Sequence, residues 1–198
     1  MRYVTVLDRE NLSNNLFITT FAQTLREHSS SYSVVLHADS SYTESLIQTG
    51  MMREDAEMRC TRELNRRLVA LMADEGVATI AMNGYQRDTV CYDGTDLNID
   101  SKYLNSLSES PALLLSNLAR NKSDESIVPV PLPLLANRLA AVLNLDEIIV
   151  FSDQAKETKS DEGTIPDAFK AAEFPFKTIS LKTFKDVSKI NKTKLTNI

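Results

Sequence analysis

Short runs of apolar and β-branched residues alternate along the chain with longer segments in which apolar residues recur at helical spacing. Such short runs are typical of strands that are buried on both faces of a sheet. They predict strands at Tyr3–Leu7, Ser33–His37, Val77–Met82, Ile127–Val130, Glu147–Phe151 and Phe176–Leu181. Alternating strands and helices predict a mostly parallel central sheet with helices on both faces, which is a three-layer α/β/α sandwich.

The segments between these runs have the pattern of amphipathic helices. The apolar stripes consist of Leu12, Leu16, Phe21, Ala22 and Leu25; Leu64, Leu68, Leu71 and Met72; and Leu135, Leu139, Val142 and Leu143. Glu63 and Arg67 are spaced to pair on the outer side of the second stripe. Ser110-Pro111 resembles an N-cap followed by proline at the first helical position, and it predicts a helix that contains Leu113, Leu114 and Leu118.

One interruption has the pattern of a small β-hairpin, from Thr89 to Leu97 around Asp93-Gly94. An Asp-Gly pair suits a type I′ turn, because both central residues of that turn have positive φ. The charged segment 154–163 predicts a mobile loop, and residues 185–198 predict a basic tail. The length of 198 residues is that of a single domain, 1–198.

Composition and charge narrow the class of protein. The net charge of −5 argues against nucleic acid as the main partner. The sequence has neither an apolar leader nor a run of ~20 apolar residues, so we expect a cytoplasmic protein and no membrane segment. Cys60 and Cys91 lack metal-ligand spacing, so packed thiols and no metal site are expected. The lysine-rich end from Lys170 is either a solvated terminus or a docking segment for an acidic partner.

Several segments, in order, resemble acetylglutamate kinase of the amino acid kinase family. Gly50–Glu57 is similar to that family's glycine-leucine-arginine-valine-threonine-aspartate-alanine-glutamate segment, and Leu64–Leu71 is similar to its asparagine-lysine-x-leucine-valine-x-leucine helix. Val34–His37 resembles the strand that leads into a histidine-glycine-glycine-glycine substrate loop. Ile148–Asp153 resembles the strand that ends on the nucleotide side. The resemblance covers about three-fifths of the chain, from Val34 to Asp153.

The resemblance implies an amino acid kinase-like sandwich that transfers the γ-phosphoryl group of ATP to the side-chain carboxylate of an N-acylated glutamate, as in arginine biosynthesis. Such an enzyme holds its phosphates with glycine-rich loops and two lysines, because it must bring two anions together and neutralise the developing charge. The resemblance also implies subunits that pair through helices beside the sheet.

Most of this phosphate-binding apparatus is missing from the sequence. The region around Asp8 and Glu10 has no lysine or glycine, and its acidic side chains would repel a phosphate. Ala38-Asp39-Ser40 stands where the family has three glycines. Tyr85-Gln86-Arg87 replaces lysine-aspartate-glycine, and Leu132–Leu134 replaces the asparagine-x-aspartate that organises the lysines. We therefore predict no family-typical catalytic residue.

The remaining candidates are binding residues at or beside predicted strand ends, except Arg53, which lies at a predicted helix start. His37, Asp39, Ser40 and Arg53 are candidates for the substrate side, and Asp153 for the nucleotide side. Two of them also have a structural interpretation: His37 as a hydrogen-bonded strand-end residue, and Arg53 as a solvated residue at a helix start. The P-loop, G-x-G-x-x-G, H-E-x-x-H and G-x-S-x-G motifs do not occur.

Three hypotheses of function follow. The leading one is a divergent, catalytically impaired acetylglutamate-kinase-like pseudoenzyme without a cofactor. It would act as a regulatory partner, in a homo-oligomer or in a hetero-oligomer with an active kinase, or would bind a small acidic metabolite. The alternative is an active carboxylate kinase that uses ATP with magnesium. The third is a hydrolase or transferase that uses the strand-end pocket around His37.

Overall fold

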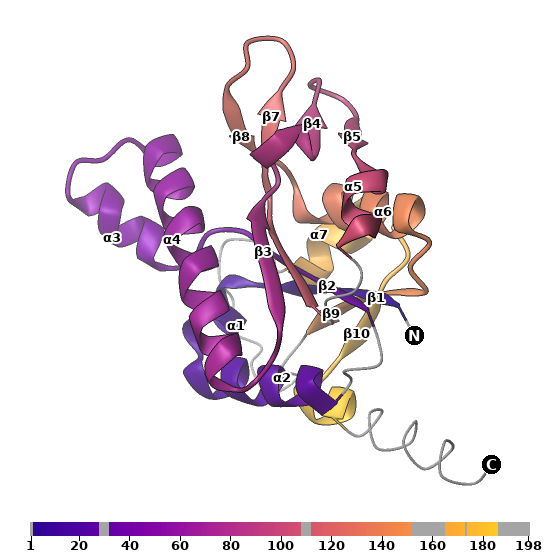
Figure 1. The fold of residues 1–198 in the computed structure, drawn as a ribbon. Coiled ribbons are helices and arrows are strands. Elements are labelled where there is room, and N and C mark those ends of the chain that lie inside the picture. Colours follow the sequence, from indigo (N-terminus) through magenta and orange to yellow (C-terminus); the bar gives the residue numbers. More distant parts are fainter. Residues whose placement is uncertain (1, 28–31, 108–111, 152–164, 173, 186–198) are drawn as a thin grey trace, which may run out of the picture.

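Two sheets organise the chain in the computed structural model, which describes residues 2–27, 32–107, 112–151, 165–172 and 174–185 (Figure 1). The large sheet has six parallel strands in the order β10-β9-β1-β2-β6-β3. They are β1 (Tyr3–Leu7), β2 (Ser33–His37), β3 (Thr79–Asn83), β6 (Ala112–Ser116), β9 (Glu147–Phe151) and β10 (Lys177–Ile179). The predicted parallel α/β sheet is confirmed, whereas Asp153, segment 154–163 and residues 186–198 lie outside the described residues.

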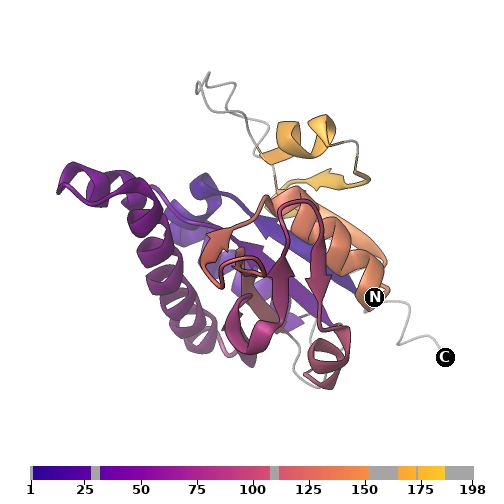
Figure 2. The same ribbon diagram turned by 90° about the horizontal axis from the view of Figure 1, so that it is seen from above.

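Helices cover both faces of this sheet, as Figures 1 and 2 show. The helices on one face are α1 (Arg9–Ser13), α2 (Asn15–Glu27) and α4 (Arg53–Asp74), and those on the other are α5 (Ser101–Ser106), α6 (Leu132–Leu143) and α7 (Ile165–Ala171). Successive residues of a strand point to opposite faces, so β1 contributes Tyr3 and Leu7 to the first layer and Val4 and Val6 to the second. Both faces of β1 are therefore buried.

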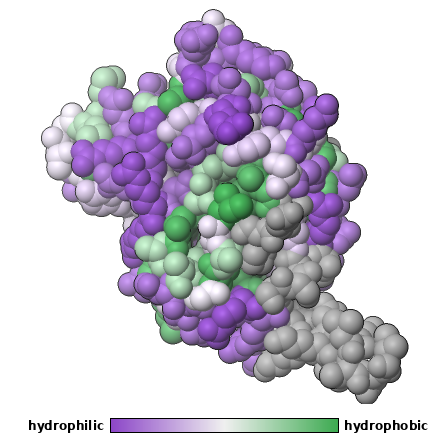
Figure 3. Space-filling view, viewed as in Figure 1, coloured by the Kyte–Doolittle hydropathy of each residue, from purple (hydrophilic) through white to green (hydrophobic). Residues whose placement is uncertain are grey.

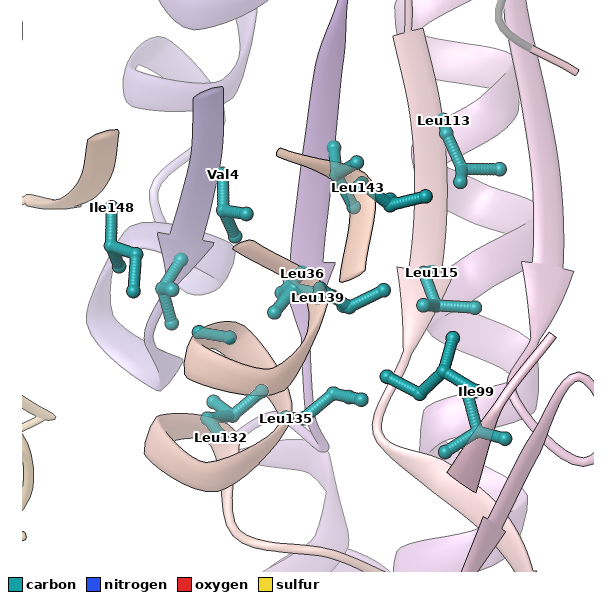
Figure 4. Packing of buried hydrophobic residues seen from close by; sticks show 14 of the residues in the cluster. Val4, Leu36, Ile99, Leu113, Leu115, Leu132, Leu135, Leu139, Leu143 and Ile148 are labelled. Carbon is teal, nitrogen blue, oxygen red and sulfur yellow. The ribbon is translucent and has the colours of Figure 1, made fainter. Parts of the chain in front are cut away.

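The layer that contains α6 is mainly aliphatic. Figure 4 shows the leucines of α6 directed toward side chains of the strands. Leu135 and Leu139 are fully buried there, beside Leu36 and Leu115. The opposite layer contains an aromatic group in which Phe21 and Phe151 meet edge to face, with ring centroids 5.5 Å apart. Burial of these side chains is the main favourable contribution to folding.

The small sheet adjoins the carboxyl ends of β3 and β6. It has the order β5-β4-β7-β8 and comprises β4 (Val90–Tyr92), β5 (Leu97–Ile99), β7 (Leu118–Asn121) and β8 (Ile127–Pro129). Only Asn117 separates β6 from β7, so one continuous chain segment contributes a strand to both sheets. Gly84, after β3, approaches the same segment closely: a Cβ there would lie 2.5 Å from the main-chain oxygen of Leu118.

The predicted hairpin is confirmed in the pairing of β4 with β5, but its predicted turn type is wrong. The loop contains the residues from Asp93 to Asp96, and Gly94 has a φ of +101° whereas Asp93 does not have positive φ. The Asp93 carboxylate accepts hydrogen bonds from the N–H groups of Thr95 and Asp96, at 3.0 and 2.8 Å. The carboxylate therefore organises a longer loop than a type I′ turn.

The predicted helix around Leu113 is wrong, because Ala112–Ser116 is strand β6. This strand lies between β2 and β3, and all its residues are buried. A short run of leucines suits a buried helix and a buried strand equally well, so the position between two strands decides its structure. The N-cap that we predicted at Ser110 lies outside the described residues.

Two smaller predictions are also wrong. The run Ile127–Val130 is not a buried parallel strand, because β8 pairs antiparallel with β7 at the border of the small sheet, where a proline is tolerated. Glu63 pairs with Arg59 at 2.9 Å rather than with Arg67. Within the ranges that the structure describes, no helix is both long and apolar enough to span a membrane.

Candidate functional site

The carboxyl ends of β1, β2, β6 and β3 lie along one edge of the large sheet, because these strands are parallel neighbours in register. Open parallel sheets bind ligands at this edge. The residues gathered there are Asp8 and Arg9 after β1; His37, Asp39 and Ser40 at and after β2; Asn83 of β3; Ser116 and Asn117 at the end of β6; and Cys60 and Asn65 from α4.

Two N–H groups of the turn after β1 are hydrogen-bonded within the turn. The Asp8 carboxylate accepts a hydrogen bond from the Asn11 N–H at 2.7 Å, and the Asn11 amide oxygen accepts one from the Asp8 N–H at 3.3 Å. This reciprocal capping box begins helix α1. Burial raises the pKa of Asp8, and the Asn11 N–H opposes that shift. These N–H groups, which could otherwise bind an anion, therefore already have acceptors within the chain.

A salt bridge joins the loops after β1 and β2. The Arg9 guanidinium contacts both oxygens of the Asp39 carboxylate, at 3.3 and 2.7 Å. The side chain of Asp39 is only 13% exposed, so this pair is shielded from solvent on its acidic side. The carboxylate of Asp39, a predicted binding residue, is thus already paired with an arginine of the chain itself.

His37 is fully buried at the end of β2. Its Nδ1 lies 2.9 Å from the Ala38 carbonyl oxygen, whereas its Nε2 has no partner at hydrogen-bonding distance in the described part of the chain. Burial lowers the pKa of His37 to about 4, and the nearby Ala38 carbonyl and Asn65 side chain oppose this shift. The imidazole is therefore neutral at physiological pH and is covered by protein.

Ser40 and Cys60 hold the loop after β2 against α4. The Ser40 hydroxyl lies 3.2 Å from the Cys60 sulfur, and the Ser40 N–H donates to the same sulfur at 3.4 Å. Cys60 and Cys91 are buried free thiols, as predicted, and burial raises the pKa of Cys91. Ser40 is accordingly a contact between elements in this structure.

Arg53 is the first residue of α4 and is exposed. Its guanidinium lies 3.4 Å from the Glu44 carboxylate and 3.7 Å from the Glu57 carboxylate. Burial raises the pKa of Glu57, and repulsion by Asp39 adds to the shift. The charges of Arg9, after β1, and of Arg53, at the start of α4, are thus compensated by carboxylates of the chain.

Sequence reasoning missed a polar network beside these residues. Asn83 accepts hydrogen bonds from Ser116 at 2.9 Å and from Asn65 at 3.4 Å. The Asn117 N–H donates to the His37 carbonyl at 3.0 Å, and its side chain donates to a main-chain carbonyl after β8. The mistaken helix around Leu113 hid Ser116 and Asn117, because only a strand assignment places them at the sheet's carboxyl edge.

A groove of about 470 Å³ begins at this network and lies between α4 and β3. Its lining residues are Arg62, Asn65, Arg66, Val69, Ala81, Met82, Asn83, Tyr85 and Gln86. Figure 3 shows apolar side chains gathered in the middle of this face, with polar ones around them. No cluster of three or more His, Cys, Asp or Glu side chains suited to a metal ion occurs among the residues described.

The fold is similar to solved kinase structures. An isopentenyl phosphate kinase matches with a TM-score of 0.65 at 10% identity, over 95% of this chain and 96% of that chain. Isopentenyl phosphate kinase of T. acidophilum matches with a TM-score of 0.63 at 12% identity, over 97% and 96% of the two chains. Aspartate kinase of Synechocystis matches with a TM-score of 0.64 at 14% identity, over 76% of this chain but only 28% of that chain.

At these identities the likeness shows the fold alone: the chain has the amino acid kinase fold. No protein family model matches the sequence, and neither does any curated protein. The particular likeness to acetylglutamate kinase therefore stays a prediction from the sequence.

Proposed function

We propose that this protein is an amino acid kinase-fold pseudoenzyme, which does not transfer phosphoryl groups and acts as a regulatory partner or as a binder of a small acidic metabolite. The observation that carries the proposal is the salt bridge between Arg9 and Asp39 beside the capping box of Asp8 and Asn11. Donors after β1 that a phosphate could use, the N–H groups of Asp8 and Asn11 and the Arg9 guanidinium, are thus paired with side chains of the chain itself.

The physical requirements of phosphoryl transfer support this proposal. ATP is held by free main-chain N–H groups and by cations, which neutralise charge on the phosphoryl oxygens. Here Arg9 and Arg53 are paired with carboxylates, and the first lysine of the chain is Lys102, which follows β1, β2 and β3 in sequence. The loss of one charge-stabilising donor costs about 2–4 kcal/mol of transition-state stabilisation in other enzymes, and such losses are not additive.

An active kinase is the second candidate, and the match to isopentenyl phosphate kinase over nearly the full length of both chains favours it. In that case Arg53 would bind an acidic group of the substrate, and ATP with magnesium would be the cofactor. Arg53 would first have to exchange Glu44 and Glu57 for the substrate. The acceptor would be an N-acylated glutamate or, by likeness to these structures, a phosphorylated alcohol.

Isothermal titration of the chain with ATP–magnesium, N-acetylglutamate and isopentenyl phosphate separates the two candidates. The pseudoenzyme proposal expects no ATP binding at micromolar concentration, and micromolar binding would refute it. Asp39→Asn tests the physical reason, because it releases Arg9 and should strengthen any residual binding of ATP. Glu54→Gln is the matched control: it also removes one carboxylate, at the start of α4, but from a residue outside the salt bridges described above.

A further inference from the structure

Two arginines one helical turn apart line the groove between α4 and β3. The guanidinium of Arg62 lies over the Tyr85 ring at 5.3 Å from its centroid, which fixes the side chain against the wall of the groove. Its Nε is buried and has no hydrogen-bond partner in the described part of the chain. Arg66 is exposed at the same groove. Residues spaced i, i+4 are neighbours on a helix surface, about 5–6 Å apart at Cβ.

Arg62 and Arg66 are among the described arginines without a paired carboxylate, as are Arg2, Arg26, Arg67 and Arg87, and they are the two that line this groove. Arg9, Arg53, Arg59 and Arg120 each lie within 4.0 Å of a carboxylate oxygen. Across the residues that the structure describes, no carboxylate lies that close to the guanidinium groups of Arg62 or Arg66. The groove therefore keeps two uncompensated positive charges in a protein whose net charge is −5.

The other residues that line the groove indicate the polarity and the size of a matching ligand. Val69 and Ala81 provide an apolar surface, and the amides of Asn83 and Gln86 lie beside it. Asn65 is 4% exposed, and its side-chain amide donates a hydrogen bond to Asn83 at 3.4 Å. A volume of about 470 Å³ is within the range of small-molecule sites. A compact ligand with two acidic ends and a short hydrocarbon middle matches this arrangement.

We propose that the groove between α4 and β3 binds a short-chain dicarboxylate, with one carboxylate at Arg62 and the other at Arg66. A guanidinium can bind a carboxylate through two parallel hydrogen bonds, and the methylene groups of the ligand cover Val69 and Ala81. The inference rests on the proposed function in one respect, because it gives the acidic metabolite its site. The groove assignment does not depend on the salt bridge between Arg9 and Asp39.

Titration calorimetry with glutarate as the probe tests the assignment on the full chain. We expect saturable binding of one glutarate per chain, and weaker binding of butyrate, which has a single carboxylate. Arg66→Gln should weaken glutarate binding about tenfold, the effect of about 1.4 kcal/mol in binding free energy. Arg59→Gln is the matched control, because it removes the same charge from the same helix but from a residue paired with Glu63. Arg59→Gln should leave glutarate binding unchanged.

Arg62→Gln should weaken glutarate binding at least as much as Arg66→Gln. Because Arg62 also packs on Tyr85, circular dichroism must show that Arg62→Gln is folded. If Arg62→Gln does not fold, Arg66→Gln still decides the test, because Arg66 is exposed. Absence of glutarate binding at millimolar concentration would overturn the inference, and so would equal weakening by Arg59→Gln and Arg66→Gln. The inference would also be overturned if the protein were a dimer that glutarate does not affect and that Arg66→Gln dissociates. The groove would then be an interface between two copies of the chain.

These results are independent of the test of catalysis. Micromolar ATP binding would refute the pseudoenzyme proposal and leave the groove assignment unchanged. Conversely, a chain that binds neither ATP nor glutarate would refute the groove assignment and leave the proposed loss of catalysis standing. Competition by inorganic phosphate would identify a general anion site, and this result would also overturn the dicarboxylate assignment.

Discussion

Buried His37 should make the protein lose stability in mildly acidic solution. Burial lowers the pKa of this histidine from 6.5 to about 4 in the folded chain. The unfolded chain therefore binds a proton at this residue at a higher pH than the folded chain does. The contribution to stability is complete above about pH 6.5 and is lost as the pH falls toward about 4.

The size of the effect follows from the two pKa values. The difference between 6.5 and about 4, at 1.36 kcal/mol for each pKa unit, corresponds to about 3 kcal/mol once both states are protonated. At about pH 5 the unfolded chain is almost fully protonated at His37, while the folded chain remains mostly neutral there. The loss caused by His37 alone is then about 2 kcal/mol.

Urea unfolding at about pH 7.5 and about pH 5 measures this loss in the unmodified protein and in His37→Asn. Asp93 and Asp124, whose pKa values are lowered from 3.8 by local hydrogen bonds, lose their contribution to stability only below this pH range. The unmodified protein should lose about 2 kcal/mol more than His37→Asn. His28→Asn removes the other histidine and should retain the full pH dependence. Equal pH dependence in the unmodified protein and His37→Asn would refute the buried, neutral state of His37.

Three further substitutions test a salt bridge, a close backbone approach and the packing of the core. The free energy of unfolding in urea is measured for each. Arg9→Gln leaves the Asp39 carboxylate, 13% exposed, without its partner and should cost about 1–3 kcal/mol. Gly84→Ala places a Cβ 2.5 Å from a main-chain oxygen and should cost more than about 2 kcal/mol, because backbone must move. Leu139→Ala, fully buried in α6, should cost about 2–5 kcal/mol.

Each of these has a control. The double variant Arg9→Gln with Asp39→Asn should recover part of the stability that Arg9→Gln loses. If the double variant instead loses the sum of the two single losses, the result would contradict the salt bridge. Gly50→Ala, where a Cβ meets open space at a φ of +91°, should cost about 1 kcal/mol from backbone strain alone. Leu16→Ala, 75% exposed, should change stability by less than about 0.5 kcal/mol; a similar cost for Leu139→Ala would show that α6 does not pack as described.

The strands that could be predicted from the sequence are those with distinct boundaries. Tyr3–Leu7, Ser33–His37 and Glu147–Phe151 were located to the residue, because β-branched residues identify each run as a strand and both of its faces are buried. Ala112–Ser116 could not be assigned, because its consecutive leucines carry no period that distinguishes a strand from a helix. Its neighbours β2 and β3 decide the matter, and they are far away in the sequence.

The candidate site was predictable in position but not in its contacts. Parallel strands imply that residues after β2 lie at the ligand-binding edge, so His37, Asp39 and Ser40 could be placed there. The pairing of Arg9 with Asp39 depends on β1 and β2 being neighbours with aligned ends, which no local pattern encodes. Likewise, the charges of Arg62 and Arg66 gain significance only because β3 lies at the sheet's edge and leaves a groove beside α4.

The strand order has a consequence for how this chain is synthesised and folds. β1 pairs on one side with β2 but on the other with β9, where Tyr3 lies opposite Glu147. A ribosome must therefore translate most of the chain before the first strand gains its second neighbour. Until then the apolar side chains of β1 and β2 are open to non-native association, and contacts this distant in sequence form slowly. We expect the parallel sheet to form slowly, and stopped-flow refolding would measure its rate.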